Sequence, residues 1–232
     1  MSCLFVVATP IGNLDDISVR ALTTLREIEV LVCEDTRVTR KLLSHFEIPK
    51  PRFLFSAHEH NEHQAVARVV GLLDKGTDVA YTSDAGMPGI SDPGYLLIRG
   101  AMAAGHRVVA IPGPSAVTTA LVVSGLPSNG FAFFGFPPRR SGKRTHFLER
   151  IASYPETLVF FESPHRLRAF LEDALTVLGN RRAAIAVELT KIFETVEQAW
   201  LAELVEMFDT PPKGEVTVVI AGDNAKFRLA QP

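Results

Sequence analysis

The chain has 232 residues, of which 47% are hydrophobic and 22% are charged, and its formal net charge at pH 7 is −2. This composition is typical of a globular protein with one large or two small domains, and it excludes a strongly basic, histone-like nucleic-acid binder. No signal-peptide pattern begins the sequence, and no run of about 18 apolar residues predicts a membrane span. Because Cys3 and Cys33 lie in apolar runs, we expect buried, reduced thiols in a cytoplasmic protein.

Strand-like and helix-like segments alternate along the first half of the sequence. Strands are expected near residues 4–9, 30–35, 52–57, 78–83 and 107–111. Helices are expected near residues 18–28, 37–46, 62–75, 94–104 and 115–124, the first with Ser18 as its N-cap. The repeated pattern predicts an N-terminal α/β domain over residues 1–125, with a mostly parallel sheet and helices on both faces.

A turn-rich break at residues 126–130 is expected to act as a hinge. After it, strands are expected near residues 131–136, 157–162, 183–189 and 215–221. Helices are expected near residues 143–153, 165–178 and 196–208, the last from ordinary amphipathic spacing. We therefore predict a second α/β domain with a mixed sheet over residues 126–232, and a ligand cleft between the two domains.

A loop rich in glycine and proline, residues 82–95, follows the apolar strand-like run at residues 79–81. Ligands of open α/β sheets usually bind at the carboxyl ends of the strands. Connectors in such folds usually take about 2–6 residues, so a ligand loop is favoured over a simple connector. Similar breaks occur at residues 10–16 and 112–115. None of them is a dinucleotide or nucleoside triphosphate motif, which argues against those ligands.

Polar residues follow three other expected strands, at residues 33–37, 162–166 and 190–191. Carboxylates and arginines at strand ends suit a polar site, but the same residues suit helix N-caps, and the sequence leaves both interpretations open. The tract at residues 58–63 carries three histidines, spaced i, i+2 and i+5. That spacing fits no usual zinc pattern, so we expect a polar loop running into a helix and no metal site.

Six segments in order, residues 8–16, 33–37, 83–94, 112–116, 124–127 and 162–166, resemble the tetrapyrrole methylase superfamily and, within it, the enzymes that methylate small-subunit ribosomal RNA. The resemblance implies a two-domain α/β fold with S-adenosylmethionine between the domains, in a homodimer. It also implies 2′-O-methylation of a decoding-region cytidine, in 16S rRNA or the small ribosomal subunit. Two alternatives are a methylase of a tetrapyrrole or other small substrate, and a non-enzymatic binding protein.

The resemblance also implies where the methyl donor binds, namely where the strand ends meet. The expected donor-binding residues are Pro10, Ile11, Asp84, Met87, Ile90, Ser115, Ala116, Phe161, Leu189 and Thr217. Methyl transfer to a ribose hydroxyl needs alignment and a proton acceptor rather than a metal. The catalytic candidates are Glu34, Asp35, Arg37, Glu162, His165 and Arg166, with Asn13 and Lys191 as lesser candidates.

One basic cluster lies at residues 139–144. A run of charges is usually a solvated face, but a flexible basic loop beside a cleft also suits a phosphate backbone. We expect the loop to contact RNA through Arg139, Arg140, Lys143 and Arg144.

Overall fold

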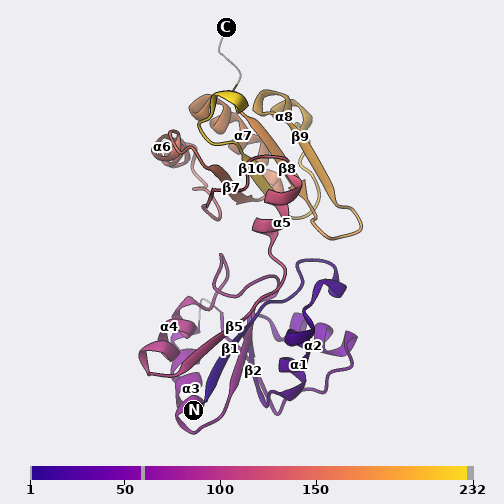
Figure 1. The fold of residues 1–232 in the computed structure, drawn as a ribbon, viewed down its shortest axis with the longest axis vertical. Coiled ribbons are helices and arrows are strands. Elements are labelled where there is room, and N and C mark those ends of the chain that lie inside the picture. Colours follow the sequence, from indigo (N-terminus) through magenta and orange to yellow (C-terminus); the bar gives the residue numbers. More distant parts are fainter. Residues whose placement is uncertain (1, 59–60, 229–232) are drawn as a thin grey trace. The chain divides into compact units, whose positions relative to one another are not determined.

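The computed structural model describes residues 2–58 and 61–228, and the chain divides into two compact units, Met1–Ser115 and Ala116–Pro232. Each unit has its own five-stranded sheet covered by helices (Figure 1). The predicted α/β fold class is therefore confirmed. Among the described residues, no helix is long and apolar enough to cross a membrane.

The sheet of the first unit is entirely parallel and has the strand order β3-β2-β4-β1-β5. Its strands are β1 (Cys3–Val7), β2 (Val30–Cys33), β3 (Phe53–Ser56), β4 (Val79–Thr82) and β5 (Arg107–Ile111). Its helices are η1 (Leu14–Asp16, a 3-10 helix), α1 (Val19–Glu27), α2 (Thr36–His45), α3 (Glu62–Asp74) and α4 (Tyr95–Ala103). Every residue of β2 and β4 is buried, as expected for central strands of a parallel sheet.

Helices cover both faces of the first sheet, as predicted (Figure 1). Alternate strand residues such as Val6 and Val32 pack with α3 and α4 on one face. Their neighbours, such as Val7 and Leu31, pack with α1 and α2 on the other. Ser18 caps α1 as predicted, since its hydroxyl accepts a hydrogen bond from the Ala21 amide at 3.1 Å.

The sheet of the second unit is mixed and has the strand order β6-β7-β10-β8-β9. Its strands are β6 (Phe131–Phe133), β7 (Thr157–Glu162), β8 (Arg182–Val187), β9 (Thr195–Trp200) and β10 (Val216–Ile220). Its helices are α5 (Ala116–Val123), α6 (Ser141–Ile151), α7 (Pro164–Leu178), α8 (Leu201–Met207) and the 3-10 helix η2 (Ala225–Phe227). Helices α6, α7 and α8 share one hydrophobic core with strands of this sheet.

The two units divide between residues 115 and 116, ten residues before the boundary that we predicted. The physical reason is the packing of α5, which contacts β7 and β10 of the second sheet. The turn-rich segment 126–130 consequently lies inside the second unit, where it connects α5 to β6.

The helix predicted at residues 196–208 is wrong in its first half, because residues 195–200 form strand β9. This strand pairs antiparallel with β8, from Arg182 opposite Trp200 to Val187 opposite Thr195. The helix itself, α8, begins only at Leu201. Backbone pairing with β8 therefore overrides the local helical pattern.

Arg181 is fully buried in the second unit, although arginine is rarely buried without a partner. Its guanidinium donates to three main-chain carbonyls, those of Leu178 at 2.9 Å, Ala152 at 2.6 Å and Ala221 at 3.3 Å. These bonds join the ends of three elements and replace the water that the charge loses.

Candidate functional site

Three loops meet at the carboxyl edge of the first sheet, after β1, β4 and β5. Thr9 and Gly86 exchange two main-chain hydrogen bonds, of 2.9 and 3.0 Å. The buried Thr9 hydroxyl also donates to the carbonyl of Ser83 at 3.2 Å. The loop after β5 approaches so closely that a Cβ at Gly113 would lie 2.9 Å from the Cβ of Ala8. The predicted ligand loops therefore form one connected edge.

Two carboxylates, Glu34 and Asp84, interlock at the ends of the adjacent strands β2 and β4. The Asp84 amide donates to Glu34 Oε2 at 3.2 Å. The amide of Asp35 donates to Asp84 Oδ1 at 3.1 Å. Burial, and then the charge of Glu34, raise the pKa of Asp84 above its ordinary value. This pair offers negative charge to an ammonium or hydroxyl group.

Asp35 and Arg37 form a local structure of their own. Asp35 is the N-cap of α2, and its carboxylate accepts from the Arg37 amide at 2.7 Å. The Arg37 guanidinium donates to both oxygens of the same carboxylate, at 2.6 to 3.1 Å. These hydrogen bonds lower the pKa of Asp35 to about 2. The helix-cap interpretation is therefore correct for Asp35, which is a poor proton acceptor near neutral pH.

The predicted donor-binding residues of the first unit lie along this edge, with different exposure. Pro10 and Ile11 are buried just after β1, and Met87 is half-buried in the loop after β4. Ile90, in the same loop, is 50% exposed. Ser115 is half-buried at the end of the loop after β5. Asn13, a lesser catalytic candidate in the loop after β1, caps η1 by accepting from the Asp15 amide.

In the second unit, the end of β7 carries a buried ion pair. Glu162 is 2% exposed and pairs with Arg166, one turn further along the chain. Glu162 Oε1 also accepts from the Ser163 amide at 2.7 Å. Glu162 Oε2 and Arg166 Nε are buried and have no hydrogen-bond partner within residues 2–58 and 61–228. His165, between them in sequence, is exposed.

Three of the four remaining predicted positions of the second unit also lie near this edge of its sheet. Phe161 and Thr217 are directly paired across β7 and β10. Leu189 is buried, two residues after β8. Ala116 is half-buried as the first residue of α5.

Lys191 is held by two carboxylates that the sequence analysis did not single out. Its ammonium lies 2.8 Å from Glu188 Oε1 and 3.0 Å from Glu215 Oε2. Burial acts to lower the pKa of Lys191, but these two hydrogen bonds raise it above its ordinary value. Lys191 therefore stays charged and acts as a link between loops. Glu215 lies 24 residues away in sequence, so no local pattern pointed to it.

The basic cluster is not the flexible loop that we predicted, because α6 begins at Ser141. Arg144 is only 4% exposed and its guanidinium lies 2.7 Å from Asp173 of α7. It also donates to the carbonyl of Ala169 at 3.1 Å. The prediction that Arg144 binds RNA is wrong, because its buried guanidinium is already paired with Asp173 inside the unit. The three other predicted RNA-binding residues are exposed: Arg139, Arg140 and Lys143.

The histidine tract at residues 58–63 runs into α3, which begins at Glu62 and so contains His63. Residues 59–60 of this tract lie outside the described residues. Glu62 accepts from the amides of Gly94 at 3.1 Å and Leu96 at 3.0 Å, and so stabilises the start of α4. No group of three or more potential metal ligands occurs in the described part of the chain.

Comparison with known proteins identifies the family. Residues 3–205 match the family model of tetrapyrrole (corrin/porphyrin) methylases. The chain belongs to the tetrapyrrole methylase family. This methylase is 46% identical over 224 residues to ribosomal RNA small subunit methyltransferase I of Halalkalibacterium halodurans, which covers 96% of this chain and 77% of that relative. It is 49% identical over 223 residues to the protein of that name from Pseudomonas aeruginosa, with 94% and 78% covered.

Solved structures share the fold. The methylase is similar to uroporphyrin-III C-methyltransferase from Thermus thermophilus complexed with S-adenyl homocysteine, with a TM-score of 0.65 and 18% identity. The match covers 96% of this chain and 98% of the other. As a member of this family, the chain is a methyltransferase with S-adenosylmethionine as its methyl donor.

The first unit has the groups that such a donor requires. The half-buried Asp84 carboxylate suits an ammonium or ribose hydroxyl, and Gly113 lets the loop after β5 approach Ala8. Ile11, in the loop after β1, and Met87, in the loop after β4, add apolar side chains to the same edge.

Proposed function

We propose that this methylase transfers a methyl group to the ribose 2′-hydroxyl of a decoding-region cytidine in 16S rRNA. We infer the substrate class, small-subunit ribosomal RNA, from one observation. The chain is 46% and 49% identical to two proteins named ribosomal RNA small subunit methyltransferase I. The choice of nucleotide and of the 2′-oxygen rests on the sequence motifs described above.

The donor supplies an electrophilic methyl group on a sulfonium, so the hydroxyl oxygen bonds to the methyl carbon as the carbon–sulfur bond breaks and its electron pair stays on sulfur. The protein must hold the two reactants in line and accept the proton of the hydroxyl. We assign donor binding to Asp84 with Ile11 and Met87. Phe161, Leu189 and Thr217 in the second unit stay predicted donor contacts.

We assign proton acceptance to Glu162. Its buried Oε2 has no hydrogen-bond partner among the described residues, whereas Oε1 is held by Ser163 and Arg166. A carboxylate fixed through one oxygen keeps the other in a defined orientation at low cost in conformational entropy. The Glu162 side chain is fully covered here, so contact with the hydroxyl requires the residues that cover Oε2 to move when the substrate binds. Asp35 is less suited, because Arg37 and the start of α2 engage its carboxylate.

Substitution at these two positions separates the roles. Glu162→Gln should lower the single-turnover methylation rate about 10²–10⁴-fold, the usual cost of a lost general base, while calorimetry finds S-adenosylmethionine affinity unchanged. Asp84→Asn should instead weaken S-adenosylmethionine binding. A Glu162→Gln rate within twofold of wild type would remove Glu162 from the mechanism.

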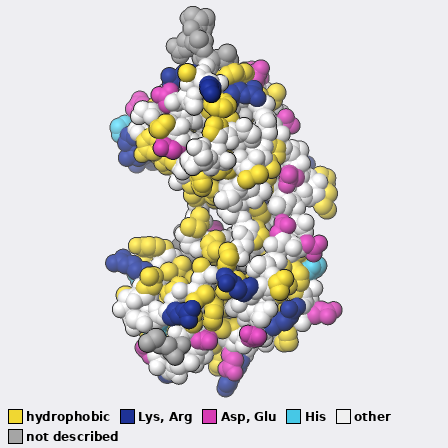
Figure 2. Space-filling view, in the orientation of Figure 1, with side chains coloured by type: hydrophobic (Ala, Val, Ile, Leu, Met, Phe, Trp, Pro, Cys, Tyr) yellow, Lys and Arg dark blue, Asp and Glu magenta, His cyan; other side chains and the backbone are white. Residues whose placement is uncertain are grey.

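Basic residues at the start of α6 are proposed to contact the RNA backbone. Arg139, Arg140 and Lys143 are exposed, and none of them has an ion-pair partner in the described part of the chain. Figure 2 shows Lys and Arg interspersed with Asp and Glu on the visible face of both units, so contact with RNA depends on local groups. Arg139→Glu with Lys143→Glu should weaken rRNA binding, and Lys50→Glu, an exposed lysine of the first unit, is the control.

We also propose a cytoplasmic homodimer. Ile192 and Phe193, in the loop between β8 and β9, are 95% and 80% exposed. Exposed large apolar side chains of this kind often mark protein interfaces. Phe193→Ser should shift the sedimentation coefficient toward that of a monomer, and an unchanged coefficient would exclude this loop from the interface.

The proposed function is tested by transfer of tritium from labelled S-adenosylmethionine. Counts should appear in small-subunit RNA, either free or in assembled subunits, and ribose-methylation mapping should place them on one cytidine. Incorporation into a tetrapyrrole but not into RNA would refute the proposal.

A further inference from the structure

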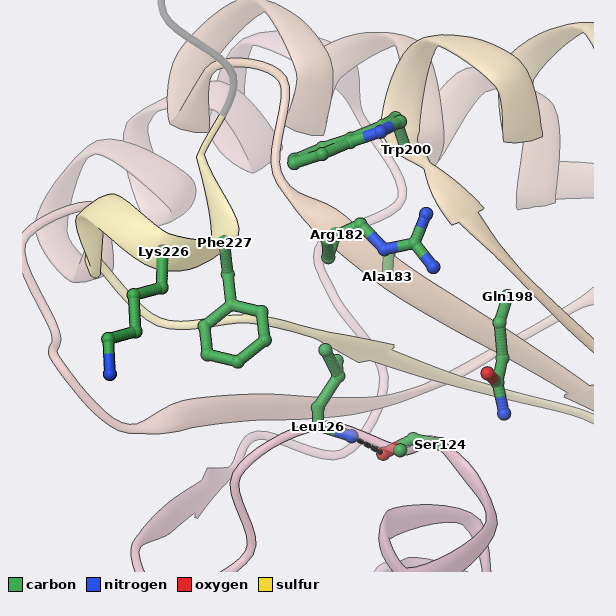
Figure 3. Close-up of a pocket in the computed structure, with 9 residues that line it drawn as sticks. Ser124, Leu126, Arg182, Ala183, Gln198, Trp200, Lys226 and Phe227 are labelled. Carbon is green, nitrogen blue, oxygen red and sulfur yellow. Dashed lines mark hydrogen bonds between the residues drawn. The ribbon is translucent and has the colours of Figure 1, made fainter.

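A pocket of about 300 Å³ lies within the second unit, away from every residue assigned above (Figure 3). We call it the Trp200 pocket. Its lining includes Arg182, Ala183, Gln198, Trp200, Lys226 and Phe227. The pocket lies where β8 begins and β9 ends, and η2 supplies one wall.

The Trp200 pocket is at the opposite edge of the second sheet from Glu162. Glu162 and Val187 both pair with Val216, whereas Ala183 pairs with Ile220 at the other end of β10. Val216 and Ile220 are four residue steps apart along the strand, which is about 13 Å at about 3.3 Å per residue. A ligand in this pocket therefore does not contact the proton acceptor.

The walls combine aromatic rings with unpaired cations. The Arg182 guanidinium lies over the Trp200 ring, 5.3 Å from its centroid, and η2 contributes Lys226 and Phe227 to the lining (Figure 3). Neither Arg182 nor Lys226 forms an ion pair within residues 2–58 and 61–228. Both positive charges are thus available to an anionic ligand.

The floor of the pocket adds one oriented acceptor. Gln198 donates through its amide nitrogen to the carbonyl of Val123 at 2.8 Å. This bond fixes the side chain and leaves its amide oxygen free of partners in the described chain. Below it, the Leu126 amide donates to the Ser124 hydroxyl at 3.1 Å (Figure 3), which holds the turn after α5 in place.

We propose that the Trp200 pocket binds one unpaired nucleotide of the RNA substrate, an inference that rests on the proposed function. Unstacked bases of single-stranded RNA stack on aromatic rings and on arginine planes. Trp200 and Phe227 provide the rings, Arg182 and Lys226 contact the adjoining phosphate, and the Gln198 oxygen accepts from an exocyclic amine. The volume is at the lower end of the range for small-ligand sites, about 300–1,000 Å³, which suits a single nucleotide.

The chain contains one tryptophan, so its fluorescence reports directly on this pocket. Titration of the full chain with a short, mixed-sequence, single-stranded RNA should quench Trp200 emission, with the same dissociation constant as that from fluorescence anisotropy of labelled RNA. Anisotropy that shows binding without any change in Trp200 emission would overturn the proposal. So would quenching by an acidic peptide but not by RNA.

Three variants test the contacts. Trp200→Ala should weaken RNA binding about fivefold to a hundredfold, the usual cost of one lost stacking contact, and Trp200→Phe should restore most of the affinity. Lys226→Glu should lower the slope of log affinity against log salt by at least about 0.7, the value for one phosphate contact with single strands. Lys50→Glu is the matched charge control and should change neither.

The outcomes separate this inference from the proposed function. If the wild type methylates small-subunit RNA but the Trp200 and Lys226 variants bind that RNA like the wild type, the pocket inference fails and the function stands. If RNA quenches Trp200 but no methyl transfer to small-subunit RNA occurs, the pocket binds RNA and the proposed function fails. In every variant, S-adenosylmethionine affinity should equal that of the wild type.

Discussion

Replacing Arg144 by alanine should destabilise the second unit without acting on RNA directly. The side chain is 4% exposed and pairs with Asp173, itself 18% exposed, at 2.7 Å. Removing one partner of a buried ion pair costs about 3–5 kcal/mol, because the other charge is left without compensation. Asp173 keeps the Ser141 hydroxyl, 3.1 Å away. We therefore expect the lower end of the range, about 3 kcal/mol.

Urea unfolding followed by Trp200 fluorescence measures this loss, since the single tryptophan lies in the second unit. Lys143→Ala, one position earlier and exposed, should change the free energy of unfolding by less than about 0.5 kcal/mol. The double variant Arg144→Met, Asp173→Leu removes both charges and should be more stable than Arg144→Ala. The reasoning is refuted if Arg144→Ala unfolds like the wild type while losing as much RNA affinity as Arg140→Ala.

Three further predictions follow from pKa shifts. Because burial and Glu34 raise the pKa of Asp84, protonation favours the folded state, and this contribution is lost as the pH rises through the raised value. Asp84→Asn should therefore increase urea stability at pH 7 relative to wild type, with no such gain at low pH. Arg37→Ala should raise the pKa of Asp35 from about 2 toward its ordinary value, as followed by NMR titration. Burial raises the pKa of Cys33 to about 11, so iodoacetamide at pH 8 should modify it only in urea.

Most of the fold was predictable because a buried strand is recognisable from a short window of sequence. The parallel strands appear as short apolar runs, and the glycine- and proline-rich loops mark their carboxyl ends. Strand β9 (Thr195–Trp200) is not an apolar run, because most of its residues are exposed or half-buried at a sheet edge. Its strand conformation depends on pairing with β8, which a local window does not contain.

The positions of the candidate site residues were easier to predict from the sequence than the roles of their side chains. The strand-end rule placed Glu34, Asp84 and Glu162 correctly at sheet edges. Arg144 was misassigned because its partner, Asp173, lies 29 residues away on another helix. A charge run in the sequence does not distinguish an arginine that faces water from one that faces a carboxylate in the core. The Trp200 pocket was missed for the same reason, since it combines the turn after α5, two strands and η2.

The adjacent arginines at the start of β8, Arg181 just before the strand and Arg182 as its first residue, have a consequence for the fidelity of strand pairing. Arg181 is buried among carbonyls, whereas Arg182 lines the Trp200 pocket. A slip of one residue moves every side chain of a strand to the other face. Since two arginines are followed by two alanines here, such a slip would keep the residue type at two of the four positions 181–184. Ile185 and Val187, which pack in the helix-covered core, are the bulky residues that penalise it. These two aliphatic side chains therefore fix the register in which the Arg181 guanidinium binds buried carbonyls and the Arg182 guanidinium remains available to a ligand.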